Sequence, residues 1–418
     1  KLFITTIVKE VGNPSVATWT EAQRALLHQF ILRGRQTIAE LAQNLAVSVP
    51  FVTKALNELI TLGWVCEVGR KENYARRAPR LYYLNATKGY FLGIDMGHHW
   101  LSLRISDFCG TMVYEHTRMP FYYEDSPACF DHLLSIVLDF LHATPLSAQQ
   151  ICSACMTVGG RVNPEAGTAY NIFTSLDGAL ADALTQGLGI ETTIDNDTRC
   201  MTYGEWLQGC CQGLRHVVFV NVSWGIGIGI IIDGKLYAGR SGYAGEMGHM
   251  HCYNNDIICH CGKTGCMETE TSGVALQRKV MQRLRDGQVS ILSNTPEDEL
   301  SLQAILDAIQ REDVLCIDVL QEVAAELGKN LAGMINIFNP EMLVIGGELS
   351  TTSDYLLRPI QMGIKKHSLN KVSEDSIIAL SSLTDCAGLV GACLTARSRY
   401  LHIDNYPSHP KQRPTHNT

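Results

Sequence analysis

The stretch AGEMGHMHCYNNDIICHCGKTGCMETE, residues 244–270, is the part of the sequence from which the fold of the whole chain can be inferred. Its spacing brings together one imidazole and three thiols, a set suited to tetrahedral Zn²⁺, and Gly262 and Gly265 allow the chain to turn around the ion. The predicted ligands are His249, Cys259, Cys261 and Cys266. Cys252, His251 and His260 are alternatives that could each replace one of these four. Because four protein ligands leave no position for a substrate water, we expect a structural zinc that braces a loop over residues 249–268.

Apolar segments with the character of strands lie on both sides of this loop. They are YFLGIDMG (90–97), LSLRISD (101–107), ICSACMTVGG (151–160), HVVFVNVSW (216–224), GIIIDG (229–234) and EMLVIGGELS (341–350). Helical patterns separate them, and such alternation is typical of an α/β body. Two segments, one from Gly93 and one from Val217, each open with strands and turns, which indicates a weak internal duplication.

The quoted stretch resembles the motif of the ROK family of repressors, open reading frames and sugar kinases, and in particular its repressors of sugar-uptake genes. That motif joins AGE-x-GH, here Ala244–His249, to Cys-x-Cys-Gly-x-x-Gly-Cys-x-Glu, here Cys259–Glu268. The resemblance covers roughly residues 20–400. It implies an actin-like, ribonuclease H-like fold of two α/β lobes, with a sugar in the cleft and His249 touching both the ion and a sugar hydroxyl.

A second part of the resemblance is TTIDNDTRCMTYGEW, residues 192–206, which has an Asn-Asp pair at the end of a strand. By itself, Asp-Asn-Asp is more often a plain turn. The resemblance implies that Asn196 and Asp197 bond sugar hydroxyls, and that Asp197 stands where kinases of the family hold their general base. It also implies a ring of sugar-binding residues completed by Asn171, Glu246, His249 and Glu268. Carboxylates and amides suit a polyol because they can satisfy its hydroxyls in pairs.

The phosphate-binding loops depart from the family pattern. Where the family's kinases carry Asp-x-Gly-Gly-Thr-Lys, this chain has DMGHHW, residues 95–100. The second loop resembles Gly-Thr-Gly-x-Gly-Gly-Gly but reads SWGIGIG, residues 223–229, with Trp224 in place of the phosphate-binding Thr. Phosphoryl transfer depends on holding phosphates and Mg²⁺ in position, so we expect a vestigial site and no enzyme activity. The alternative is an ATP-dependent sugar kinase with an appended DNA-binding head.

Residues 19–86 have the pattern of a winged helix-turn-helix domain, ahead of a two-lobed domain expected over residues 87–402. Three short helices are predicted after Thr20, Thr37 and Ser48, followed by two strands around a basic loop. In such modules the second helix of the turn enters the major groove and the wing contacts phosphate or the minor groove. The predicted DNA-binding residues are Ser48, Val49, Pro50, Phe51, Thr53, Lys54 and Asn57 on the helix, and Arg70, Lys71, Arg76 and Arg77 on the wing. A trihelical bundle used for protein contact is the alternative.

The distribution of charge agrees with a DNA-binding head. The first 90 residues hold 12 of the 34 Lys and Arg but only 6 of the 42 Asp and Glu, so a basic head precedes an acidic body. The 15 cysteines are an odd number without a disulfide framework, which favours a reducing compartment, and we expect a cytoplasmic protein without membrane insertion. Residues 1–18 are expected to be an N-terminal arm and residues 403–418 a mobile tail.

Together these features predict a transcriptional repressor of carbohydrate uptake or metabolism genes. Its expected partners are operator DNA and an effector, which could be a sugar, a sugar phosphate or a regulatory protein. Because one head offers few phosphate contacts, we expect a homodimer or homotetramer that reads a palindromic site.

Overall fold

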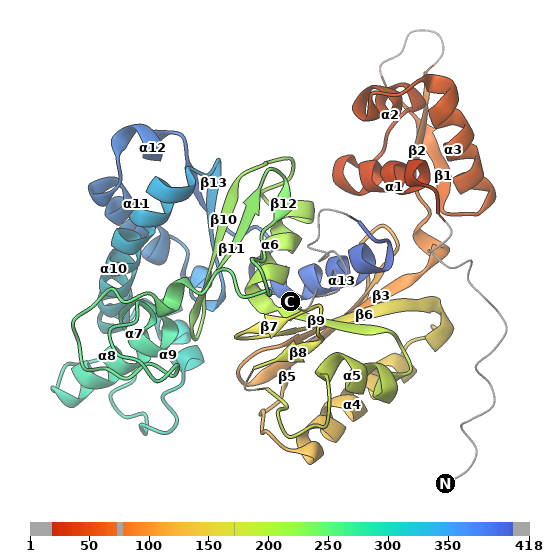
Figure 1. The fold of residues 1–418 in the computed structure, drawn as a ribbon. Helices are drawn as coiled ribbons and strands as arrows, with labels where there is room; N and C mark the ends of the chain where they lie inside the picture. Colours follow the sequence, from red (N-terminus) through yellow and green to blue (C-terminus); the bar gives the residue numbers. More distant parts are fainter. Residues whose placement is uncertain (1–18, 73–77, 171, 404–418) are drawn as a thin grey trace, which may run out of the picture.

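The computed structural model describes residues 19–72, 78–170 and 172–403. Figure 1 shows a small head, formed by the N-terminal residues, beside a body of two lobes. The predicted N-terminal arm and all but the first residue of the predicted tail lie outside the described residues.

The head consists of three helices and a hairpin. Its elements are α1 (Glu21–Arg33), α2 (Ile38–Leu45), α3 (Val49–Thr61), β1 (Val65–Arg70) and β2 (Arg80–Leu84). The first two helices begin after Thr20 and Thr37, as predicted, and each of these residues forms a capping box with the residue three positions on. Gly34 follows the end of α1. Ser48 is the residue before α3, but its side chain makes no capping hydrogen bond. The strands pair antiparallel, so the head has the expected winged helix-turn-helix form.

Each lobe of the body contains a five-stranded sheet, and the two sheets have the same topology. The first has the order β5 (Met112–Pro120), β4 (Trp100–Asp107), β3 (Tyr90–Met96), β6 (Ile151–Val158) and β9 (Thr192–Asn196). The second has the order β12 (Lys235–Leu236), β11 (Ile226–Ile232), β10 (Val217–Val222), β13 (Met342–Gly346) and β14 (Ile377–Leu380). In both, the first three strands are antiparallel and the last two run parallel to the third. The internal duplication and the actin-like fold are therefore confirmed.

Two helices pack against each other where the lobes meet, α6 (Asp197–Gln208) and α13 (Ala387–Tyr400). They approach closely because glycines face each other at the crossing: a Cβ on Gly204 would lie 2.8 Å from the carbonyl oxygen of Ala387. The remaining helices cover the outer sides of the lobes (Figure 1). They are α4 (Pro127–His142) and α5 (Leu180–Leu188) on the first lobe, and α7 (Glu268–Thr271), α8 (Gly273–Arg285), α9 (Leu302–Gln310), α10 (Val314–Phe338), α11 (Asp354–His367) and α12 (Asn370–Glu374) on the second.

The head is joined to the first lobe by a shared aromatic core. The ring centroids of Trp19 and Trp64, in the head, are 4.8 Å apart, and that of Trp64 is 5.3 Å from the ring of Phe108, in the turn between β4 and β5. Phe108 in turn contacts Phe91 of β3. Ile403, which was predicted to begin the mobile tail, is instead buried in this same cluster, and its N–H donates to the carbonyl of Ser398.

Candidate functional site

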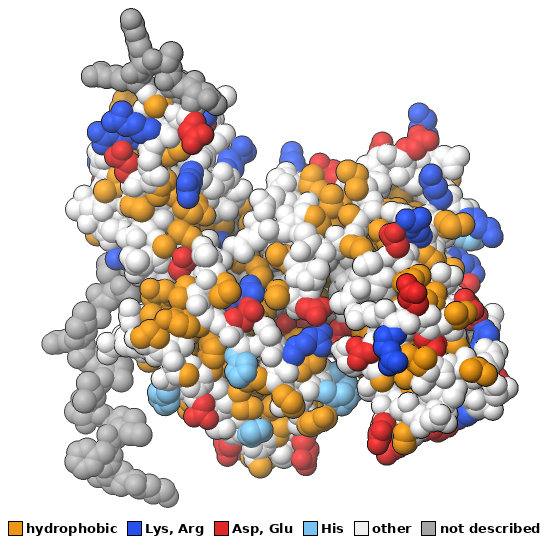
Figure 2. Space-filling view, turned by 180° about the vertical axis from the view of Figure 1, so that it is seen from behind, with side chains coloured by type: hydrophobic (Ala, Val, Ile, Leu, Met, Phe, Trp, Pro, Cys, Tyr) orange, Lys and Arg blue, Asp and Glu red, His pale blue; other side chains and the backbone are white. Residues whose placement is uncertain are grey.

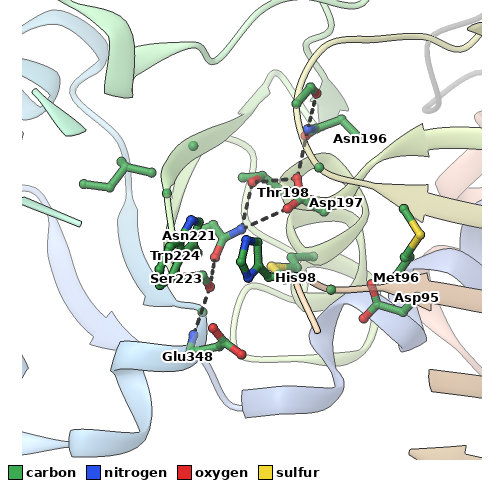
Figure 3. Close-up of a pocket in the computed structure, with 18 of the residues that line it drawn as sticks. Asp95, Met96, His98, Asn196, Asp197, Thr198, Asn221, Ser223, Trp224 and Glu348 are labelled. Atoms are coloured by element: carbon green, nitrogen blue, oxygen red, sulfur yellow. Dashed lines mark hydrogen bonds between the residues drawn. The ribbon is translucent and has the colours of Figure 1, made fainter. Parts of the chain in front are cut away.

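A cavity of about 330 Å³ lies between the two lobes (Figure 3). Its walls come from the ends of strands in both sheets and from the loops that follow them. Its lining includes Asp95, His98, Asn196, Asp197, Asn221, Trp224, Glu246, His249, Glu268 and Glu348. Five of the six predicted sugar-binding residues line this cavity: Asn196, Asp197, Glu246, His249 and Glu268. The sixth, Asn171, lies outside the described residues.

Asn196 and Asp197 are held at the start of α6. The Asn196 side chain accepts the N–H of Arg199, which caps the helix, and its amide donates to the carbonyl of Gly160 at 2.9 Å. Asp197 Oδ1 accepts the N–H of Thr198, and Asn221 Nδ2 lies 3.5 Å from Asp197 Oδ2. Burial raises the pKa of Asp197. The predicted pair thus meets the cavity with acceptor oxygens suited to hydroxyl groups.

Behind this pair lies a buried ion cluster that the sequence analysis did not identify. Asp195 is completely buried and contacts two guanidinium groups: Arg199 Nε donates to Oδ1 at 2.7 Å, and Arg399 Nη2 donates to Oδ2 at 3.0 Å. Arg199 also donates to the carbonyl groups of Gly242 and Val162. Because these carbonyls belong to the short strand β7 (Val162–Asn163) and to the segment before Ala244, the cluster fixes the start of α6 relative to both.

Glu268, which the resemblance implied to be a sugar-binding residue, also has partners within the protein. It lines the cavity, but Oε2 accepts the N–H of Ile226 at 3.0 Å and Oε1 lies 2.7 Å from Nδ1 of His260. Both carboxylate oxygens therefore have partners within the protein. Glu246, by contrast, has Oε2 only 3.7 Å from Nε2 of His249, so it faces the ring edge that points away from the thiols. The contact between His260 and Glu268 was not predicted from the sequence, in which His260 was only an alternative metal ligand.

The four predicted metal ligands come together beside the cavity. The donor atoms of His249, Cys259, Cys261 and Cys266 all lie within 4.8 Å of one another, with His249 Nδ1 3.6 Å from Cys259 Sγ and the other two Sγ atoms 3.6 Å apart. Tetrahedral zinc with bonds of about 2.3 Å to sulfur and 2.0 Å to nitrogen separates its ligands by about 3.5 to 3.8 Å. The donor set therefore fits that ion in both chemistry and size.

The three alternative metal ligands, His251, Cys252 and His260, lie in or near the same loop. Gly265 has φ +74°, and a Cβ there would collide with the ring of His251. His251 is thereby packed against the backbone, with Nδ1 3.3 Å from the carbonyl of Thr264. Within the described residues, a second group that could hold a metal shares His249 and adds His260 and Glu268, whereas Cys252 and His251 belong to neither group.

Aromatic side chains stack on each other where the two phosphate loops of the family's kinases are expected. His98, from the turn after β3, stacks on Trp224, from the turn after β10, with ring centroids 4.6 Å apart and planes inclined by 19° (Figure 3). Burial lowers the pKa of His98, which favours the neutral ring in this stack. Gly97 offers no room either, because a Cβ there would meet the ring of Trp100.

A second bridge crosses the lobes next to this stack. Trp100 Nε1 donates to Glu348 Oε1 at 3.2 Å, and the Arg118 guanidinium lies 3.6 Å from Glu348, 3.4 Å from Asp385 and over the Trp100 ring. We call these four side chains the interlobe clasp. Arg118 has φ +51° where the pairing of β4 and β5 shifts register, and Thr384, next to Asp385, has φ +49°. Non-glycine residues with such φ values cost energy and cluster at functional sites. No sequence motif pointed to Arg118, Glu348 or Asp385.

The outward side of α3 is exposed, as predicted from the helical pattern. Val49, Pro50, Phe51, Lys54 and Asn57 are exposed, together with Ser48 ahead of the helix. The Thr53 hydroxyl instead donates to the carbonyl of Val49 at 2.8 Å, within its own helix.

On the wing, Arg70 is exposed, whereas the ammonium group of Lys71 pairs with Glu40 and lowers the pKa of that carboxyl. Lys71 would have to leave this ion pair, or share its ammonium group, to contact a DNA phosphate as predicted. Arg76 and Arg77 lie outside the described residues. Figure 2 shows Lys and Arg side chains on the head, interspersed with acidic and apolar ones. Among the helices in the described part of the chain, none has the length and apolar character needed to cross a membrane.

Comparison with known proteins agrees with this architecture. A xylose repressor of Caldicellulosiruptor bescii is 28% identical over 85% of this chain and 90% of its own, and the DNA-binding transcriptional dual regulator NagC of Escherichia coli K12 is 27% identical over 94% and 96%. A solved ROK family transcriptional regulator, a homologue of the E. coli MLC protein, superimposes with a TM-score of 0.75 at 27% identity, covering 92% of this chain and 98% of that one. Residues 91–399 match the ROK family. The chain therefore belongs to the ROK family.

Proposed function

We propose that this protein is a DNA-binding transcriptional repressor that responds to a carbohydrate-related signal. The observation that carries the proposal is the combination within one chain of an exposed helix α3 on a winged head and a polyol-type site whose phosphate loops are filled by His98 and Trp224. Relatives named as sugar repressors, matched over nearly their whole length, support the same function. Such a regulator acts in the cytoplasm, where operator DNA is present.

In this proposal α3 lies in the major groove of operator DNA. Lys54 and Asn57 are exposed on its outward side, one with a charge for phosphate and the other with an amide that can form two hydrogen bonds with adenine. Arg70, and Arg76 and Arg77 beyond it, would neutralise phosphates from the wing. A homodimer, or a tetramer built from it, would place two heads on the two halves of a palindrome.

The alternative function, sugar phosphorylation, is disfavoured by the structure of the cleft. ATP-dependent transfer needs Mg²⁺ and donors around the phosphates, and here an aromatic stack and a carboxylate, Glu348, lie beside the two loops. In this proposal Asp197 keeps the position of the kinase general base but takes no part in phosphoryl transfer.

The cysteine and histidine cluster is proposed to hold a structural zinc ion. His249, Cys259, Cys261 and Cys266 would fill all four positions of a tetrahedral ion, which then neutralises thiolates and keeps Glu268 and His249 in place at the cavity. The zinc supplies rigidity, while the hydroxyl-binding groups are those of the chain itself.

Helix α6 is proposed to connect the effector site to the head. It begins with Asp197 at the cavity and ends with Gln208, whose amide donates to the carbonyl of Gly110 at 3.0 Å. Gly110 belongs to the same turn as Phe108, which packs on Trp64 of the head. A shift of α6 on ligand binding would therefore reach the head through a short series of packed groups.

The function can be tested by selecting binding sites for the purified protein from a random duplex library, followed by titrations at several salt concentrations. We expect an enriched palindrome, bound far more tightly than random DNA. Asn57→Ala should change the preference at one base position, whereas Lys54→Ala should weaken binding to all duplexes and reduce the salt slope by about one. Equal affinity for every sequence would contradict the proposal.

A further inference from the structure

We infer that the cavity takes an uncharged sugar and excludes sugar phosphates. This inference rests on the proposed function, since it specifies the effector of the same site. It follows from the fixed charges around the cavity and from the partners that those charges already have.

The cavity is strongly acidic. Six acidic side chains line it: Asp95, Asp197, Glu246, Glu268, Glu348 and Asp385. Burial raises the pKa of Asp95 and of Asp197, so the negative charge comes mainly from the other four. Among the described residues that line it, Arg118 is the only Lys or Arg. A phosphate monoester carries about −1.5 to −2 charges at neutral pH and is bound in proteins by Arg, Lys or free backbone N–H groups at a helix start. This cavity would therefore repel such a group unless a cation were available to it.

Arg118 is already engaged by the interlobe clasp. Its guanidinium lies between the carboxylates of Glu348 and Asp385, at 3.6 and 3.4 Å, and its face covers the ring of Trp100. A phosphate that approached Arg118 would have to displace these carboxylates or lie beside them. The clasp thus uses the single guanidinium to join the lobes.

Several further donors at the cavity are occupied as well. At the start of α6, the N–H of Thr198 donates to Asp197 and the N–H of Arg199 donates to Asn196, so the helix end is closed by the chain's own side chains. His98 is stacked on Trp224, and His260 contacts Glu268 at 2.7 Å.

What remains suits a neutral polyol. Asp197 and Glu246 present acceptors, while Met96, Ile172 and Met201 provide an apolar wall against which a sugar ring can pack. A volume of about 330 Å³ is at the lower end of ligand sites, which range from about 300 to 1,000 Å³. The cavity therefore matches one monosaccharide without a charged substituent.

The experiment is calorimetric titration of the full chain with D-xylose, D-glucose and N-acetylglucosamine, and with glucose 6-phosphate and N-acetylglucosamine 6-phosphate. We expect at least one uncharged sugar to bind, and sugar phosphates to bind at least 100-fold more weakly. A phosphate ester that binds as tightly as its parent sugar, or more tightly, would overturn the inference. Absence of binding by all three uncharged sugars would also overturn the inference. The proposed function is tested separately, by operator binding.

A double variant isolates the electrostatic cause. Glu348→Gln with Asp385→Asn keeps the shapes and most hydrogen bonds but releases Arg118 from both carboxylates. We expect the affinity for the sugar phosphate, relative to that for the uncharged sugar in the same variant, to rise at least tenfold over the parent. The matched control is Glu374→Gln with Asp375→Asn, which removes the same charge from exposed positions at the end of α12. Equal gains in both double variants, or none in either, would contradict the role of the clasp.

Discussion

Replacement of Asp95 by asparagine should change how the stability of the protein depends on pH. Asp95 lies near the end of β3 inside the cleft, where its carboxylate accepts the hydroxyl hydrogen of Thr157 and lies against Gly388 at the start of α13. Burial raises the pKa of Asp95 from 3.8 to about 7. The folded protein therefore keeps a proton on Asp95 at pH values where the unfolded chain has lost it.

The sign and size of the effect follow from this difference. Between pH 4 and 7 the folded state binds more protons than the unfolded state, so the free energy of unfolding falls as the pH rises. A shift from 3.8 to about 7 corresponds to a loss of about 4 kcal/mol across that interval, with no further loss above it. The amide of the Asp95→Asn protein cannot ionise, so this variant should lack the loss and gain stability relative to the parent with increasing pH.

Urea unfolding of both proteins at pH 5, 6, 7 and 8 measures this difference. Thr157→Val provides a second test, because the Thr157 hydrogen bond holds the pKa of Asp95 down and its removal should extend the loss of stability to higher pH. Parallel stability curves for Asp95→Asn and the parent over this range would refute the reasoning, since they would mean that Asp95 is ionised in the folded protein throughout.

Three further predictions concern the proposed zinc ion, the expected absence of kinase activity and the proposed connection to the head. The purified protein should contain about one zinc per chain by elemental analysis, and Cys261→Ser should reduce that content whereas His251→Ala should not. A coupled assay with ATP, Mg²⁺ and hexoses should detect no turnover, because His98 and Trp224 stack on each other where the family's kinases carry phosphate-binding residues. Gln208→Ala should leave ligand affinity unchanged but reduce the effect of ligand on operator affinity, whereas Gln212→Ala, at an exposed position beyond α6, should preserve it.

Each of these predictions has an outcome that contradicts it. Full zinc content in Cys261→Ser would remove that thiol from the ligand set. A turnover rate of roughly 1 to 100 s⁻¹, the range of typical kinases, would favour the alternative function of a sugar kinase. Unchanged coupling between ligand and operator in Gln208→Ala would show that α6 does not transmit the signal through Gly110.

Much of this protein could be predicted from its sequence because the relevant interactions are local. The N-caps Thr20 and Thr37 need only the residue three positions on, and the proposed metal ligands Cys259, Cys261 and Cys266 lie within eight residues. The α/β alternation follows from runs of apolar residues, whose burial depends on periodicity along one strand or helix. The outward side of α3 follows from the same rule.

The tertiary structure alone decided which distant side chains meet. Arg118, Glu348 and Asp385 form the clasp only because two sheets of equal topology face each other, and because a register shift next to Arg118 sets its direction. The partner of Glu268 and the burial of Ile403 are likewise outcomes of packing. Sequence patterns encode the hydrogen bonding and burial within each helix or strand. Side-chain contacts between elements depend on how those elements are placed against one another, and a local sequence pattern does not contain this placement.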